Sequence, residues 1–177
     1  NAMANNASSL FPALIDKDDI KNRLQDIIHK ACSMAQRNQK LKITGRMELS
    51  FVITGDSGTG KTTVAKNIAQ EFFYAGIVKS AIPTIINPIE FSNWVKTLDE
   101  NVKKIGNGVL IIEEAHKLVP EGEASDVAPI DYILQPLRKW KSDPNFPIVI
   151  FTGQKRLKNY FNSNPNGYHT PDCVIRA

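Results

Sequence analysis

The sequence predicts a single α/β domain in which a parallel sheet is covered by helices on both faces. Short, continuously apolar runs alternate with segments of helical periodicity, as is typical of parallel strands buried on both faces. A glycine-rich loop stands between one such run and one such helix. The 177 residues, 42% hydrophobic and 23% charged, suit one core and one domain of ordinary size.

The first half of the chain supplies a helix, a strand and a second helix. Apolar residues recur at helical spacing over residues 16–38, which predicts an amphipathic helix. The run 49–54 is short and rich in β-branched residues, so it predicts a strand that feeds the glycine-rich loop. Beyond the loop, apolar residues from Val64 to Phe72 repeat at helical spacing. Gly76 then stands where a left-handed C-terminal cap is expected.

The second half repeats the alternation of strand and helix. One helix is expected over residues 90–105. Another begins near Pro129, which suits a first helical turn, and contains an irregularity at Pro136. The expected strands are residues 83–87, 109–112, 147–152 and 173–177.

Composition argues against several classes of protein. No run approaches the roughly 20 apolar residues needed to cross a membrane, and the N-terminus lacks a secretory signal, so we expect a cytoplasmic protein. Cys32 and Cys173 lie far apart without metal-ligand spacing, which disfavours a disulfide framework or a zinc site. The excess of 22 Lys and Arg over 18 Asp and Glu is too modest to argue for nucleic acid. Residues 1–2 resemble an expression-tag remnant, which leaves 3–177 as the domain.

The glycine-rich loop carries the strongest chemical signal. A polyphosphate needs several backbone N–H groups directed at one place, and glycines let the chain wrap it closely. The helix that begins near Lys61 adds the positive end of its dipole, Lys61 can reach the β and γ phosphates, and the Thr62 hydroxyl can ligate Mg²⁺. The loop therefore predicts a purine nucleoside triphosphate, ATP with Mg²⁺. The expected nucleotide-binding residues are Gly55, Asp56, Ser57, Gly58, Thr59, Gly60, Lys61, Thr62 and Thr63.

Two carboxylates, Glu113 and Glu114, follow the apolar run 109–112. They stand at the C-terminal end of the expected strand, the edge at which open α/β sheets bind ligands. This arrangement resembles a Walker B motif, in which Glu113 would hold Mg²⁺ and Glu114 would polarise the attacking water. The alternative is a pair of exposed carboxylates at a helix start. Beside a P-loop we favour the Walker B interpretation. His116 has no nucleophile partner and is expected in a loop or at a helix start.

Together these motifs resemble the AAA+ ATPases, and within them the CbxX/CfqX branch with its rubisco-activase-like and sporulation-protein-K-like members. The resemblance implies a three-layer α/β/α P-loop NTPase fold with a parallel five-stranded sheet in the order 5-1-4-3-2. It places Ile15 against the adenine and gives the sensor role to Thr152 or Gln154, at the end of the fourth strand. The segments that carry it are 14–21, 51–66, 108–118, 128–131, 148–154 and 161–165.

The resemblance also implies an ATP-driven machine that assembles as a homo-oligomeric ring, expected to be a hexamer, and moves a protein client with a pore loop. At the pore-loop position the chain has Trp94, Val95 and Lys96, with lysine where the family usually has glycine. Trp94 is therefore a candidate client contact. The equally favoured alternative is that Trp94 packs in a core face, because its apolar neighbours have helical spacing.

Three departures from the family pattern affect these expectations. Glu113 stands where the family usually has aspartate, and Mg²⁺ tolerates such a change poorly. Residues 167–173 contain no arginine at the position of the family's arginine finger, so hydrolysis could be slow, with Arg156 or Arg176 as substitutes outside the motif. The helical lid and its sensor-2 arginine are missing, so we expect a truncated piece of a longer protein.

The first hypothesis is an ATPase core with Lys61 and Glu114 as catalytic residues and Thr62 and Glu113 at the metal, driving the remodelling of a protein client. The second is a nucleotide-dependent switch or scaffold that hydrolyses ATP slowly, supported by the absent arginine finger. The third, a nucleic-acid-remodelling ATPase of the helicase-loader type, ranks last because the basic clusters are small.

Overall fold

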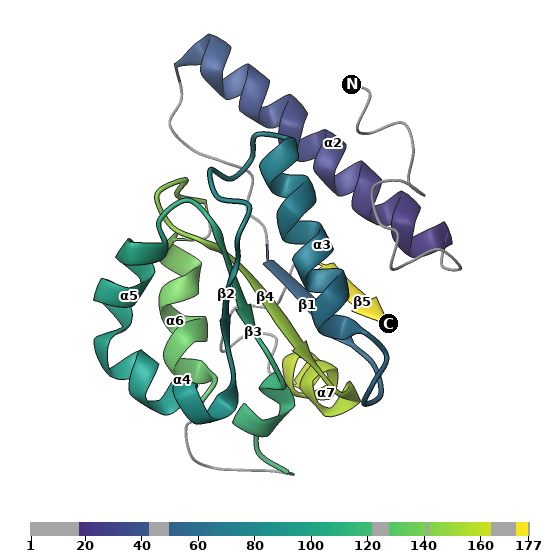
Figure 1. Ribbon diagram of the computed structural model, residues 1–177, viewed down its shortest axis with the longest axis vertical. Coiled ribbons are helices and arrows are strands. Elements are labelled where there is room, and N and C mark those ends of the chain that lie inside the picture. Colours follow the sequence, from purple (N-terminus) through teal and green to yellow (C-terminus); the bar gives the residue numbers. More distant parts are fainter. Residues whose placement is uncertain (1–17, 43–49, 122–127, 141, 164–172, 177) are drawn as a thin grey trace.

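Five parallel strands form the sheet on which the described helices pack (Figure 1). The computed structural model describes residues 18–42, 50–121, 128–140, 142–163 and 173–176. The strand order β2-β3-β4-β1-β5 is the expected order, with every neighbouring pair parallel. The strands are β1 (Ser50–Thr54), β2 (Thr84–Ile86), β3 (Val109–Ile112), β4 (Ile148–Gly153) and β5 (Cys173–Arg176).

Helices cover both faces of the sheet, so the structure has the expected three layers. Alternate residues of one strand enter different cores: Phe51 and Ile53 of β1 join the core on one face, while Val52 joins the other. The first core packs under α2 (Asp18–Leu41) and α3 (Lys61–Tyr74), which lie beside each other in Figure 1. The second core packs under α4 (Pro88–Trp94), α5 (Leu98–Ile105), α6 (Asp131–Trp140), α7 (Lys155–Ser163) and two 3₁₀ turns, η3 (Val95–Thr97) and η4 (Ala115–Leu118).

Residues next to the helices determine where α3 ends and where α4 begins. Gly76 has a φ of +78° just beyond α3, as the sequence predicts for a left-handed cap. Pro88 opens α4 behind an Asn87 cap, whose side-chain oxygen accepts the N–H of Glu90. Within the described residues, no helix combines the length and the apolar character needed to span a membrane.

The prediction of a single helix over residues 90–105 is wrong, because η3 divides this segment into the two helices α4 and α5. Thr97 leaves helical geometry at φ −122° and ψ 43°, so a carbonyl of the preceding turn needs another partner. Asn101 provides it by donating its side-chain N–H to the Trp94 carbonyl at 2.9 Å and to the Thr97 hydroxyl at 3.0 Å. Helix α7, with nine residues shortly after β4, is not among the elements expected from the sequence.

The parallel arrangement brings three loop starts to one edge of the sheet. The glycine-rich loop follows β1, Glu113 and Glu114 follow β3, and Gln154 follows β4. The register pairs Thr54 with Gly153, and the ladder continues past the strand because the Gly55 N–H donates to the Gly153 carbonyl at 3.1 Å. The glycine-rich loop, the two glutamates after β3 and the end of β4 are therefore neighbours in space.

A buried aspartate joins α6 to α7 and supplies a test of the fold. Asp131 is 2% exposed; one carboxylate oxygen accepts the Ala128 N–H at 3.0 Å and the other accepts the Tyr160 hydroxyl at 2.6 Å. We expect Tyr160→Phe to lower the free energy of unfolding by about 1–2 kcal/mol, because a buried acceptor loses a donor. Urea denaturation measures the change. The matched control is Tyr132→Phe, at a tyrosine 62% exposed on α6, and an equal loss in both variants would contradict the assignment.

Candidate nucleotide-binding site

The glycine-rich loop between β1 and α3 forms an open cradle. Gly58 and Gly60 have φ values of +80° and +81°, and a Cβ added at either would meet nothing within 4 Å. Glycine is favoured there by backbone conformation, since a left-handed residue with a side chain costs about 1–2 kcal/mol. The Thr59 hydroxyl donates to the Asp56 carbonyl at 2.8 Å and closes the loop on itself. The cradle is thus preformed by the chain.

Two positive features point into this cradle. The Lys61 ammonium donates to the carbonyls of Gly55 at 3.0 Å and Asp56 at 2.7 Å, so its charge lies over the loop. Helix α3 begins at the same residue. Among the described residues no side chain caps its first turn, and that turn contains no acidic residue. Its free N–H groups and the dipole of a 14-residue helix favour an anion at this end.

The first of the two carboxylates after β3 meets the end of the loop. Thr62 donates its hydroxyl to a Glu113 carboxylate oxygen at 2.9 Å, and both side chains are half-buried. The backbone of Glu113 is held as well, because its N–H donates to the Ile86 carbonyl at the end of β2. A hydroxyl oxygen and a carboxylate oxygen side by side are the kinds of ligand that Mg²⁺ prefers.

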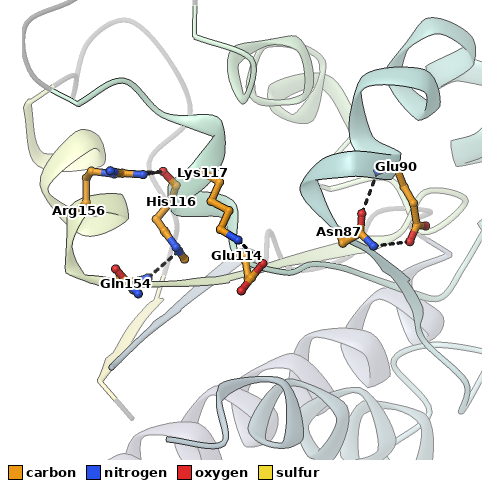
Figure 2. Close-up of polar contacts among 7 residues, drawn as sticks. All are labelled: Asn87, Glu90, Glu114, His116, Lys117, Gln154 and Arg156. Atoms are coloured by element: carbon orange, nitrogen blue, oxygen red, sulfur yellow. Dashed lines mark hydrogen bonds and ion pairs between the residues drawn. The ribbon is translucent and has the colours of Figure 1, made fainter. Parts of the chain in front are cut away.

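The second carboxylate turns away from the first, because Glu114 has a left-handed backbone with φ 47° and ψ 39°. Its side chain is exposed and accepts the Lys117 ammonium at 3.0 Å (Figure 2). The hydrogen bond from Lys117 lowers the pKa of Glu114. Burial opposes this shift, and the charges of Lys117, His116 and Lys61 add to it. Glu114 is therefore a carboxylate at neutral pH, able to accept a proton or a hydrogen bond.

His116 is the second residue of η4, the 3₁₀ turn that follows these carboxylates, which agrees with the expected loop or helix-start position, and its side chain is buried. Its Nδ1 accepts the backbone N–H of Gln154 at 3.1 Å, and its carbonyl accepts two N–H groups of Arg156 (Figure 2). Burial lowers the pKa of His116, and the Arg156 guanidinium lowers it further. The imidazole is thus neutral at pH 7.

These groups surround one cleft of about 290 Å³. Most of the residues expected to bind nucleotide, metal or water border it, and so do both sensor candidates. The lining is Ser57, Gly58, Gly60, Lys61, Thr62, Thr63, Glu113, Glu114, His116, Thr152 and Gln154.

A family model described as "ATPase family associated with various cellular activities (AAA)" matches residues 51–161, the stretch that contains every group of the cleft. The chain belongs to this family. AAA+ proteins usually bind ATP and form oligomeric rings, so family membership implies nucleotide binding, and this cleft is the candidate site for it.

Relatives of this AAA domain match the CbxX/CfxQ branch. Protein CfxQ of Xanthobacter flavus is 32% identical over 168 residues, which cover 89% of this chain and 51% of that protein. Protein CbxX, chromosomal, of Cupriavidus necator is 31% identical over 160 residues, which cover 86% of this chain and 50% of that protein. The chloroplastic ribulose bisphosphate carboxylase/oxygenase activase of Cyanidioschyzon merolae is 29% identical over 164 residues, which cover 86% of this chain and 54% of that protein. The chain spans about half the length of these curated relatives.

Not every expected site residue of the AAA domain borders the cleft. Gly55, Asp56 and Thr59 are outside its lining and take part in the side-chain-to-backbone hydrogen bonds of the loop given above. Ile15 lies outside the described residues. Trp94 is half-buried and packs against the second core, so a client contact through it stays a prediction.

The structural contacts of His116 and Arg156 are not predicted by the sequence. The sequence shows no nucleophile partner for His116 and suggests Arg156 only as a substitute arginine finger. In the structure Arg156 bonds the His116 carbonyl and, at 2.7 Å, the Glu121 carboxylate of the same chain. Neither role has a local sequence signal, because both partners of Arg156 are more than 30 positions away.

The lowered pKa of His116 predicts how stability changes with pH. Below the ordinary histidine pKa of about 6.5, position 116 binds more protons in the unfolded chain than in the folded chain. The stability that His116 contributes is therefore fully present above that pH, and it is lost as the pH falls toward the lower pKa of the folded state. We expect His116→Asn, which keeps an acceptor near the Nδ1 position and cannot titrate, to lose less stability than wild type between about pH 7.5 and 5.5. Urea denaturation across this range measures the difference.

The matched control is His29→Asn, at a histidine exposed on α2. This variant should keep the pH dependence of the wild type. If His116→Asn follows the wild-type curve as closely as His29→Asn does, burial of a neutral imidazole at position 116 is refuted.

Proposed function

We propose that this AAA domain binds ATP with Mg²⁺ and hydrolyses it, and that hydrolysis in a homo-oligomeric ring, expected to be a hexamer, drives the remodelling of a protein client. One observation carries the hydrolytic part. The Thr62 hydroxyl and the Glu113 carboxylate meet at 2.9 Å in the cleft that also contains Lys61 and Glu114. A phosphate-binding loop, a metal-ligand pair and an ionised carboxylate are the parts that phosphoryl transfer to water requires.

The residues present fit a magnesium ion. Thr62 and Glu113 would hold it, with water and phosphate oxygens as the other ligands that Mg²⁺ usually keeps. When bound, Mg²⁺ neutralises charge that develops on the phosphate oxygens. Glu113 in place of the usual aspartate is compatible with this pair, because its carboxylate already reaches the Thr62 hydroxyl.

Other groups of the chain would bind the phosphates and act on the attacking water. The loop N–H groups and Lys61 bind and orient the phosphates, since they are fixed donors around one cradle. Glu114 accepts a proton or a hydrogen bond from the attacking water, for which its ionised carboxylate is suited. Thr152, 1% exposed at the end of β4, and Gln154 border the phosphate side as sensor candidates.

A second candidate function is a switch that binds ATP and hydrolyses it slowly. Its support is the Lys117 ammonium, which already occupies one oxygen of Glu114 and weakens it as a base. Arg156, one of the arginines that could have served a neighbouring subunit, is bonded within its own chain. The measurement below separates the two candidates.

The first test is steady-state phosphate release from ATP by the full-length protein, with nucleotide binding measured on each variant. We expect Glu114→Gln to bind ATP but lose turnover by about 100-fold or more, because the base is removed while the phosphate donors stay. We expect Lys61→Ala to weaken ATP binding by at least about tenfold, because a charge-assisted donor is lost.

The control for Lys61→Ala is Lys66→Ala, at a lysine exposed on the same helix, which should behave as wild type. Wild type that binds ATP tightly yet turns over no faster than Glu114→Gln would replace the ATPase by the switch. Turnover stimulated several-fold by DNA at low salt would favour the nucleic-acid-remodelling alternative.

A second test concerns the strength of the base. Replacing Lys117 by methionine removes the donor that lowers the pKa of Glu114, so the pKa should rise toward the ordinary glutamate value. Carboxyl ¹³C NMR of Glu114 through a pH titration measures the midpoint. Lys104→Met, at a lysine exposed on α5, is the charge-matched control and should leave the midpoint in place. An unchanged midpoint in Lys117→Met would show that the Lys117–Glu114 pair does not form in solution.

A further inference from the structure

We infer that His116 is a positioning residue: through the peptide group between Gly153 and Gln154, it ties the turn that carries Glu114 to the phosphate-binding loop. The inference rests on the proposed function, because it assigns His116 a part in ATP hydrolysis. It goes beyond that function because His116 is neither a metal ligand nor the base.

Two hydrogen bonds in series make the connection. The Gly55 N–H donates to the Gly153 carbonyl at 3.1 Å, and the Gln154 N–H donates to His116 Nδ1 at 3.1 Å. The carbonyl of Gly153 and the N–H of Gln154 belong to the same planar peptide group. Each bond therefore polarises the other, and a displacement at one end is transmitted rigidly to the other.

The imidazole is held closely against the end of β4. His116 is 7% exposed, and its ring approaches β4 so closely that a Cβ on Gly153 would lie 3.0 Å from Nδ1 and 3.1 Å from the His116 N. Only glycine permits that approach without movement. The His116 carbonyl accepts Nε and Nη2 of Arg156, and Arg156 Nη1 reaches Glu121. Backbone and side chain of His116 are thus fixed to β4 and α7.

The turn that His116 fixes needs such support. Glu114 adopts a left-handed backbone, which is unfavourable for a residue with a side chain and persists where the surroundings enforce it. Its carboxylate is exposed, so packing does not fix it. Two residues later the chain is anchored by His116. Because misplacement of a catalytic group by about 1 Å can cost about 100-fold in rate, the anchor matters for turnover more than for nucleotide binding.

The test compares His116→Asn with His116→Leu in the full-length protein. Asparagine keeps an acceptor near the position of Nδ1, whereas leucine fills similar space without one. We expect His116→Leu to lower kcat about tenfold or more while the Kd for ATP changes by less than about threefold, and His116→Asn to recover most of the loss.

Hydrogen exchange gives a second readout that does not need turnover. The Gln154 amide should exchange faster in His116→Leu than in wild type or His116→Asn, at matched overall stability, because it loses its acceptor. Arg156→Gln should lower kcat in the same direction without replacing a buried residue. Lys158→Gln, at an exposed position of α7, is its charge-matched control.

The outcomes separate this inference from the proposed function. If wild type hydrolyses ATP and His116→Leu matches it, or the Gln154 amide exchanges equally in all variants, His116 is not a positioning residue while the ATPase assignment stands. If wild type and Glu114→Gln are equally inactive, the ATPase assignment itself fails, and the positioning role fails with it.

Discussion

The pairing of β1 with β4 is the interaction on which the rest of the site depends. Its register sets Thr54 opposite Gly153, so the glycine-rich loop and the end of β4 begin at the same level of the sheet. Pairing of β4 with β3 then brings Glu113 and Glu114 to that edge. Because parallel strands end together, three segments that are distant in sequence supply one cleft. A shift of one residue in this register would also turn each strand's core residues to the wrong face.

Backbone direction, more than residue type, gives two adjacent glutamates different surroundings. Glu113 continues from β3, is held by the Ile86 carbonyl and meets Thr62. Glu114 follows with a left-handed backbone, and its side chain is exposed and accepts the Lys117 ammonium. One carboxylate is thereby half-buried beside a hydroxyl, which suits the proposed metal ligand. The other is ionised and accessible to water, which suits the proposed base.

Polar contacts behind the cleft tie its parts to the scaffold. Asp131 links α6 to α7 through the Tyr160 hydroxyl, and α7 in turn carries Arg156 to the His116 carbonyl. The second core is therefore coupled to the turn that holds Glu114. A charged pair such as Arg156–Glu121, with Glu121 82% exposed, adds modest energy, whereas the bonds to the His116 carbonyl fix geometry at a buried residue.

The sequence by itself determined the α/β class, the strand positions and the phosphate-binding loop, because periodicity and glycine spacing are properties of neighbouring residues. Family resemblance added the strand order. Only the tertiary structure decided which groups meet. Thr62 and Glu113 are 51 positions apart, and the bond of His116 to Gln154 spans 38. The break at Thr97 depends on the Asn101 side chain, which competes with the helical hydrogen bonds that periodicity assumes. Burial likewise distinguishes His116 from an exposed histidine, and burial is a property of the folded chain alone.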